Sequence, residues 1–250
     1  MYPMVNIAQL TDLHLFAQQN EKFHGQNSWH TYNQVMALLK KNSYDAAIIT
    51  GDISGDGSIE SYANFMLGIN NLTTPLYYVL GNHDNMSAFL QVTEVLPIIC
   101  HDKCFVMGAW CFILLNSYCA NCDQGVLSEN EIAFLKQSIQ NNCDKYIAIF
   151  LHHHPVPINS TFIDSNMLTN AKIFMGIVTT SHNVRLVVFG HIHQAFSARI
   201  SNVDFLGTPA TSLQFRPQQD LFEINMSATP AYREISLHPD GSFITRICNI

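Results

Sequence analysis

Residues 81–84 read Gly81-Asn82-His83-Asp84, and they follow directly on an apolar run, residues 76–80. The run predicts a buried strand. Open α/β folds carry their chemistry on the loops that follow strand ends, and Asn, His and Asp side chains suit such a loop. Polar residues of the same kind follow four further apolar runs, namely Asp12 with His14, Asp52, His152, and His191 with His193. The repetition indicates one site assembled from five strand-end loops.

Strands and helices alternate along the first third of the chain. The apolar runs 5–10 and 46–50 predict strands, and apolar side chains at helical spacing predict helices from Ser28 to about residue 41 and over residues 59–69. Alternation of this kind implies parallel strands joined by right-handed crossovers. The carboxyl ends of such strands lie on one edge of the sheet, so the polar residues that follow them are expected to converge.

Two candidate ligands lie close together after the first strand. Asp12 and His14 flank a single residue. In an extended chain this spacing points both side chains the same way, so that one cation could take both. With Asp52 and Asn82 they form the cluster expected from the first half of the chain.

The rest of the chain continues the alternation and then changes character. The expected elements are a helix over 87–96, a hairpin of 105–107 with 110–115, a helix begun by a capping box of Ser128 and Glu131, a strand over 146–151, a helix over 171–179 and a strand over 185–189. From about residue 196, short runs between turn signals predict antiparallel strands. We expect an α/β (α+β) fold whose two parts, up to about residue 115 and from about 145, form two mixed sheets packed face to face with helices outside.

The composition limits the classes of function. A chain of 250 residues with 48% hydrophobic residues can bury a large core, and we expect one domain over residues 1–250. The net charge of -7 gives no general attraction to nucleic acid phosphates, so a nucleic acid partner is disfavoured. Histidine occurs 12 times, and neutral imidazole is the commonest metal-binding side chain.

The N-terminal residues and the cysteines favour a cytoplasmic protein. The sequence shows neither a secretory signal nor a segment long enough to span a membrane, so no membrane partner is expected. The number of cysteines, 7, is odd, and their spread does not resemble a secreted disulfide framework. Cys119 and Cys122 form a CxxC without a second pair, and they are expected to be reduced loop thiols.

The polar strand-end residues form a set too large for one ion and suited to two. The set is Asp12, His14, Asp52, Asn82, His152, His191 and His193. Mixed oxygen and imidazole ligands favour manganese, iron or zinc over magnesium or calcium. Two neighbouring cations clamp a phosphoryl group during in-line displacement, and a carboxylate must bridge them. Asp52 is the expected bridge because its loop lies between the two groups of ligands.

In its ordered motifs the sequence resembles the calcineurin-like metallophosphoesterase superfamily. The superfamily signature of DxH, GD, GNH[DE], a later His and GHxH is present as Asp12-Leu13-His14, Gly51-Asp52, Gly81-Asn82-His83-Asp84, His152 and Gly190-His191-Ile192-His193. The flanking stretches TDLHLFA, GDIS, LHHHPVP, GHIHQ and TSLQFRP resemble the bacterial class III 3′,5′-cyclic AMP phosphodiesterases. The resemblance covers essentially the whole chain.

The resemblance implies a role for each motif residue. One metal would be held by Asp12, His14, Asp52 and His193, and the other by Asp52, Asn82, His152 and His191. It implies that His83 is no ligand, but faces the substrate phosphate as proton donor to the leaving oxygen or as a stabiliser of developing charge. Asp84 would hold the His83 imidazole in its tautomer.

Expected substrate contacts are less sharply defined by the same resemblance. They come from His14, Asn82, His83, His154 and His193. For His153 and His154, a substrate or supporting contact and a plain loop position both stay open. The stretch 208–215 offers Gln214 and Phe215 to a nucleoside, and the alternative is that it only packs the second sheet.

The implied activity is hydrolysis of 3′,5′-cyclic AMP to 5′-AMP by a metal-bound hydroxide. It would use two divalent or mixed-valence ions per chain, with iron or manganese ahead of zinc, in a monomer or homodimer. Alternatives are a phosphodiesterase of broader specificity, acting on glycerophosphodiesters or 2′,3′-cyclic nucleotides, a phosphomonoesterase, a nuclease, and a non-enzymatic scaffold of the same fold. The complete ligand set disfavours the scaffold, and the acidic charge without a basic stripe disfavours the nuclease.

Overall fold

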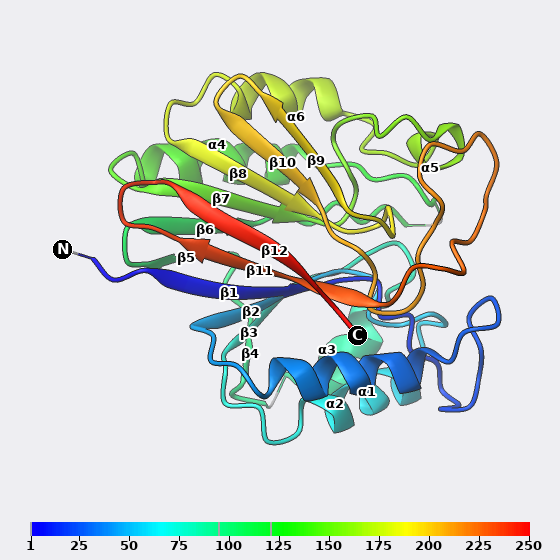
Figure 1. The fold of residues 1–250 in the computed structure, drawn as a ribbon. Coiled ribbons are helices and arrows are strands. Elements are labelled where there is room, and N and C mark those ends of the chain that lie inside the picture. The colour runs from blue at the N-terminus through cyan, green and yellow to red at the C-terminus, as the bar shows by residue number, and fades with distance from the viewer. Residues whose placement is uncertain (1, 95, 121) are drawn as a thin grey trace.

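Two six-stranded mixed sheets pack face to face, and helices cover their outer faces (Figure 1). The computed structural model describes residues 2–94, 96–120 and 122–250. Within these ranges no helix has the length and apolar character needed to cross a membrane. The expected sandwich of two mixed sheets flanked by helices is confirmed.

The first sheet has the strand order β12-β11-β1-β2-β3-β4. Its strands are β1 (Val5–Leu10), β2 (Ala46–Thr50), β3 (Leu76–Val79), β4 (Ile99–Cys100), β11 (Ala231–Leu237) and β12 (Phe243–Asn249). Strands β1 to β4 are parallel, whereas β11 and β12 are antiparallel to their neighbours. Apolar side chains of its outer face pack with those of α1 (Ser28–Leu39), α2 (Ile59–Ile69) and α3 (Met86–Thr93).

The second sheet has the order β5-β6-β7-β8-β10-β9. Its strands are β5 (Cys104–Met107), β6 (Trp110–Leu114), β7 (Tyr146–Leu151), β8 (Val184–Phe189), β9 (Phe196–Ile200) and β10 (Val203–Gly207). Strands β6, β7, β8 and β10 are parallel to one another. The helices that belong to this half are α4 (Glu129–Asn141), α5 (Thr161–Asp164) and α6 (Ala171–Val178).

The central strands are buried on both faces, which explains why they read as unbroken apolar runs. All five residues of β2 are buried. Ala46 and Ile48 face the layer between the sheets, while Ala47 and Ile49 face the helices. Because side chains alternate along a strand, a sheet covered on both sides needs apolar residues at every position. This covering leaves the strand-end loops as the place for polar side chains.

The expected boundary between the two sheets is wrong. The predicted hairpin forms between β5 and β6, but both strands lie in the second sheet rather than at the end of the first. The last two strands return to the first sheet, where β11 pairs with β1. The C-terminal strands are mostly antiparallel as expected, except that β10 lies parallel to β8.

Some local expectations also need correction. Helix α1 is capped by Asn27, whose side chain accepts a hydrogen bond from the His30 amide, and not by Ser28. Ser128 caps α4, but the Glu131 carboxylate bonds the Asn116 amide instead of closing the capping box. Tertiary contacts, which local sequence patterns do not reveal, help to decide such hydrogen bonds.

The CxxC expectation is wrong as well. Cys119 and Cys122 are joined as a disulfide. The remaining cysteines are free thiols. The pair lies in the connection between β6 and α4.

A buried arginine ties the two sheets together at the C-terminal hairpin. Arg233 on β11 is 4% exposed and donates to the Thr208 hydroxyl, the Gly207 carbonyl and the Thr245 hydroxyl, at 2.8–3.0 Å. Burial lowers the pKa of Arg233 to about 10. The guanidinium is therefore charged at neutral pH, and its bonds go to neutral oxygens on β12 of the first sheet and at the end of β10 in the second.

Arg233→Ala is expected to lower the free energy of unfolding by about 3 kcal/mol, because buried acceptors lose their donor and a cavity is left. Urea denaturation of the purified protein measures the change. Arg246→Ala is the matched control, since this exposed arginine pairs with Glu234 on the same hairpin. Equal shifts of the denaturation midpoint in the two variants would contradict the tying role of Arg233.

Candidate metal centre

Five strand-end loops meet at one edge of the sandwich and bring all seven expected ligands together. The loops follow β1, β2, β3, β7 and β8. Four groups of three side chains have ligand atoms within 4.8 Å of one another, and among them they include every expected ligand except Asn82. Asn82 joins through its side-chain oxygen, which lies 3.1 Å from His152 Nε2. The convergence arises because the first three strands are parallel within one sheet and the other two within its partner.

The backbone at these loops is unusual. Asp12, His14, Asp52, His191 and His193 have φ values of 53°, 44°, 50°, 69° and 49°, in the left-handed region. Non-glycine residues seldom adopt this conformation, and clusters of it occur at functional sites. The expectation of an extended chain at Asp12 and His14 is therefore wrong, although both side chains do join one cluster.

Two of the motif glycines are required by close packing against ligands. A Cβ atom at Gly51, where φ is 95°, would overlap the His152 ring. A Cβ atom at Gly81 would overlap the Asp52 carboxylate. Each glycine therefore lets the backbone of one loop approach a ligand from another.

One group of ligands lies around His193. Its Nε2 atom is 3.3 Å from Asp12 Oδ1 and 3.1 Å from His14 Nε2. His14 Nε2 in turn lies 3.6 Å from Asp52 Oδ2. Asp12, His14 and His193 are all buried.

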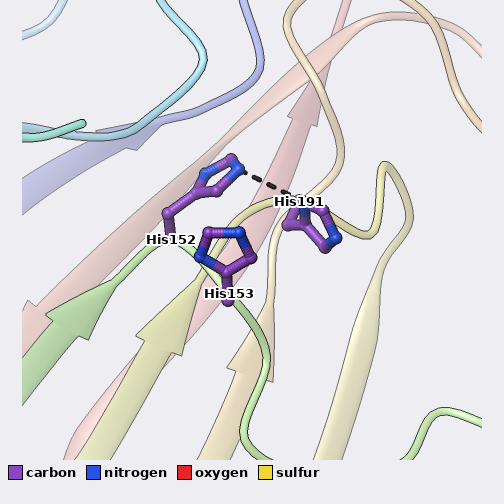
Figure 2. Close-up of side chains that lie close together, drawn as sticks. All are labelled: His152, His153 and His191. Carbon is purple, nitrogen blue, oxygen red and sulfur yellow. Dashed lines mark hydrogen bonds between the residues drawn. The ribbon is translucent and has the colours of Figure 1, made fainter. Parts of the chain in front are cut away.

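A second group lies around His152. Its Nε2 atom is 3.1 Å from Asn82 Oδ1, 3.3 Å from His191 Nδ1 and 3.4 Å from Asp52 Oδ2. Figure 2 shows His152 and His153 on the loop after β7 and His191 facing them from the loop after β8. The same oxygen of Asp52 thus borders both groups, as a bridging carboxylate would.

The hydrogen bonds on the far side of two imidazoles show that this set fits cations. His152 Nδ1 lies 2.7 Å from the Thr50 carbonyl, and His193 Nδ1 lies 2.8 Å from the Leu213 carbonyl. Because a carbonyl only accepts, each Nδ1 carries a proton, and in its neutral form each ring turns the lone pair of Nε2 toward the cluster. That lone pair meets carboxylate, amide and imidazole acceptors, an arrangement that a bound cation satisfies.

The ionisation of the buried groups shows where this cluster is short of positive charge. Burial, outweighing the nearby carboxylates, lowers the pKa of His14 to about 3, so its imidazole is neutral at pH 7. Burial disfavours charge on Asp52, but His152 and other histidines overcome it and hold the pKa of Asp52 well below its usual range. Burial likewise opposes charge on His152, yet Asp52 raises the pKa of His152 to about 9, so that at neutral pH a proton on its Nε2 supplies the positive charge beside Asp52 that a bound cation would supply in its place. A negative oxygen among imidazoles is a strong cation ligand.

Asp84 does not orient His83. Its carboxylate accepts hydrogen bonds from the backbone amides of Ile53, Ser54 and Gly81 and from the Tyr62 hydroxyl, at 2.9–3.2 Å. The expected pairing with His83 is wrong because these four donors occupy a carboxylate that is only 4% exposed. Asp84 instead fixes the loop of Asp52 to the loop of Asn82. Burial and the Asp52 charge raise the pKa of Asp84 to about 6.

His83 and the later histidines occupy different surroundings. His83 is exposed and lines a pocket of about 220 Å³ together with Asn82, His14 and His193. Its ring stands edge-on to His14 at 4.9 Å between centroids. Its ligand atom also lies within 4.8 Å of those of His14 and Asp52, so the position of His83 allows both a substrate contact and metal ligation.

Neither His153 nor His154 lines that pocket, although both are buried beside it. The His153 nitrogens lie 2.8 Å from the Ser117 hydroxyl and 3.1 Å from the Asp123 carbonyl. His154 Nε2 lies 3.2 Å from Asp164 Oδ1, with no surface toward solvent. The structure therefore favours a supporting position for His154 over the expected substrate contact.

For residues 208–215 the sequence left two alternatives open, contact with a nucleoside and packing of the second sheet. Different parts of the stretch fit each of them. The Gln214 amide is buried and bonds the backbone of Ala210, and Thr208 belongs to the Arg233 network, so this part packs the fold. Phe215 lines the pocket and stacks on His193. Sequence reasoning missed three other pocket phenylalanines, Phe23, Phe162 and Phe222, because two lie on irregular segments and Phe162 lies on a helix of only four residues, too short to show periodicity.

A two-sheet sandwich with carboxylate, amide and imidazole ligands at one edge defines a protein with a candidate polynuclear metal site. The model of the calcineurin-like phosphoesterase family matches residues 5–195. The chain therefore belongs to the calcineurin-like phosphoesterase family.

Relatives by sequence extend over nearly the whole chain. A 3′,5′-cyclic-nucleotide phosphodiesterase of a Nostoc species is 36% identical over 97% of this chain and 91% of its own length. The 3′,5′-cyclic adenosine monophosphate phosphodiesterase CpdA of Escherichia coli strain K12 is 31% identical over 97% of this chain and 89% of its own.

Solved structures share the fold at low sequence identity. A dimetal phosphatase of Danio rerio superposes with a TM-score of 0.70 at 13% identity, covering 96% of this chain and 98% of its own. GAP50, described as the anchor in the inner membrane complex of Plasmodium, gives 0.69 at 14% identity, covering 98% and 84%. The fold thus accommodates proteins described as an enzyme and as an anchor, so the site has to decide between such functions.

The shared position of Asp52 leads to a test of metal binding. Metal-free protein titrated with Mn²⁺ in a calorimeter is expected to bind two ions per chain. Asp52→Asn should weaken both ions about tenfold or more, since a neutral amide is a poor bridge, whereas His193→Ala should weaken mainly one.

Asp102→Asn, an isosteric change at an exposed carboxylate, is the control and should leave both ions unchanged. A wild-type stoichiometry that never exceeds one, or loss of only one ion in Asp52→Asn, would refute the bridging assignment.

Proposed function

We propose that this chain is a phosphodiesterase that uses two metal ions to hydrolyse 3′,5′-cyclic AMP to 5′-AMP. One observation carries the chemistry: Asp52 Oδ2 lies 3.6 Å from His14 Nε2 and 3.4 Å from His152 Nε2, between two groups of ligands. Relatives named as cyclic nucleotide phosphodiesterases, matched over 97% of the chain, support the substrate.

The proposed ligands divide between two cations that share Asp52. Asp12, His14, Asp52 and His193 would hold one, and Asp52, Asn82, His152 and His191 the other. When bound, the cations supply Lewis acidity toward the phosphate and lower the pKa of water for attack at phosphorus. Mixed oxygen and nitrogen ligands favour iron or manganese, with zinc as an alternative.

His83 is the proposed proton donor in this reaction. In-line attack at phosphorus expels the oxygen opposite, which in the cyclic ester is the ribose 3′ oxygen. An exposed imidazole at the pocket wall, beside His14 and Asp52, can deliver a proton to that oxygen or stabilise its developing charge. Asn82 and the ligands His14 and His193 also line the pocket and are proposed to contact the phosphate.

Further proposals concern the whole chain. Pairing of β11 with β1 joins the end of the chain to its beginning and supports a single domain over residues 1–250. A cytoplasmic location is part of the proposal: five cysteines, Cys100, Cys104, Cys111, Cys143 and Cys248, are free thiols, while the Cys119–Cys122 disulfide counts against it. We propose a small-molecule substrate rather than a nucleic acid or a membrane, and a monomer or homodimer.

A hydrolysis panel tests the proposed substrate. Under one metal condition, kcat/KM for 3′,5′-cyclic AMP is expected to exceed that for 2′,3′-cyclic AMP, glycerophosphodiesters and phosphomonoesters. Cyclic GMP serves as the comparison for the base. If 3′,5′-cyclic AMP is cleaved no better than the poorest compound, only a general metal-dependent phosphodiesterase remains, and no turnover of any ester would favour a scaffold.

His83→Ala is expected to lower kcat roughly 10²-fold or more through loss of the proton donor, while metal content stays near wild type. Steady-state kinetics and metal analysis of the same preparation measure both. His30→Ala removes an exposed histidine on α1 and should change neither. Loss of metal in the His83 variant would show that this side chain is a ligand.

A further inference from the structure

The mouth of the metal pocket carries an apolar surface that the chemistry at phosphorus does not use. Phe162 on α5 and Phe222 on the segment after β10 both line the pocket, and they are 41% and 36% exposed. Single exposed apolar side chains are ordinary on protein surfaces. Two that touch each other at the edge of a polar site form a surface that an apolar part of a ligand can cover.

These two rings are connected to the metal ligands through a third. Phe215 stacks on the His193 imidazole, with 4.1 Å between ring centroids and 5° between planes. Phe222 stands edge-on to Phe215 at 5.0 Å, and Phe162 contacts Phe222 at 5.3 Å. Phe215, Phe222 and Phe162 therefore form a continuous row of aromatic rings from the ligand cluster to solvent.

The segment that carries Phe222 is held in place. The backbone amide of Arg216 donates to the Glu223 carbonyl at 2.8 Å, and the two side chains form an ion pair at 2.8 Å. Phe215 and Ile224 pair as a β-bridge just outside this loop. Phe222 thus lies on a loop whose two ends are bonded to each other.

A second set of contacts fixes this loop beside α5. The Ser160 hydroxyl donates to the Gln219 carbonyl at 2.9 Å, and the Thr161 hydroxyl donates to the Asp220 carboxylate at 2.6 Å. Figure 1 shows the orange segment after β10 running next to α5. Helix α5 and the loop of Phe222 are thus bonded to each other. Because this holds Phe162 and Phe222 side by side before any ligand binds, the entropic cost of binding is lower.

We propose that Phe162 and Phe222 form a stacking platform for the base of the nucleotide substrate. The inference rests on the proposed function, which places the phosphate among the metal ligands. A nucleotide carries its base one sugar away from the phosphate, and the platform lies beyond the ring of Phe215 that covers His193. Stacking on aromatic rings accepts any base, so the platform selects nucleotides over other diesters without selecting adenine over guanine.

Binding of 5′-AMP and of ribose 5-phosphate to the manganese-loaded protein tests the platform, because the two ligands differ only in the base. In Phe222→Ala and Phe162→Ala, the Kd for 5′-AMP is expected to rise about tenfold, the effect of losing one aromatic–base stack. The Kd for ribose 5-phosphate should stay unchanged. KM for 3′,5′-cyclic AMP should rise by a similar factor, with kcat close to wild type.

Two control variants separate stacking from damage to the loop. Phe222→Tyr keeps the ring and should restore wild-type binding of 5′-AMP. Met226→Ala changes an 83% exposed side chain on the same segment that does not line the pocket, and it should have no effect. Urea denaturation midpoints and metal content of all variants should match wild type.

The platform is refuted if Phe222→Ala and Phe162→Ala weaken 5′-AMP and ribose 5-phosphate equally, or weaken neither. Failure of the proposed substrate gives a different result. In that case wild type does not hydrolyse 3′,5′-cyclic AMP, yet it still binds 5′-AMP more tightly than ribose 5-phosphate, and Phe222→Ala removes the difference. The two ideas can therefore fail separately.

Discussion

Buried acceptor atoms that face one another are the constraint on which this structure depends. Asp52 Oδ2 borders imidazole nitrogens of His14 and His152, and the proton on the far nitrogen of His152 is committed to the Thr50 carbonyl. Desolvated lone pairs and carboxylates at such distances repel unless a positive charge lies between them, which either the Nε2 proton of His152 or a bound cation supplies. The arrangement therefore has the character of a preformed cation site, and it requires rigid support from the surrounding fold.

That support comes from the backbone of neighbouring loops more than from other side chains. The Thr50 and Leu213 carbonyls orient His152 and His193, and left-handed backbone at Asp12 and Asp52 turns their carboxylates inward. Asp84 collects three amides and a tyrosine hydroxyl, and so locks two ligand loops to each other. Asp84, although next in sequence to the candidate proton donor His83, thus serves to hold the loops in place.

The fold separates apolar packing from polar chemistry in space. Three apolar layers fill the sandwich, between the sheets and under the helices on either side, and every expected ligand lies at the strand ends. The C-terminal hairpin closes the first sheet, and buried Arg233 on β11 connects it to the end of β10, just before the stretch that carries Phe215. Contacts remote from the metals therefore help to position the wall of the pocket.

The sequence by itself determined the long buried strands, their order of appearance and the seven candidate ligands, because buried parallel strands require unbroken apolar runs and the motif loops follow directly on them, whereas the two-residue strand β4 was not predicted. It did not determine which sheet receives β5, β6, β11 and β12, since pairing partners far apart in the chain decide that. Asp84 was misassigned for the same reason: its four donors come from two separate loops and a helix, and sequence adjacency to His83 says nothing about them. Phe162 and Phe222 carry no periodic signal, and only the tertiary structure brings their rings together at the mouth of the site.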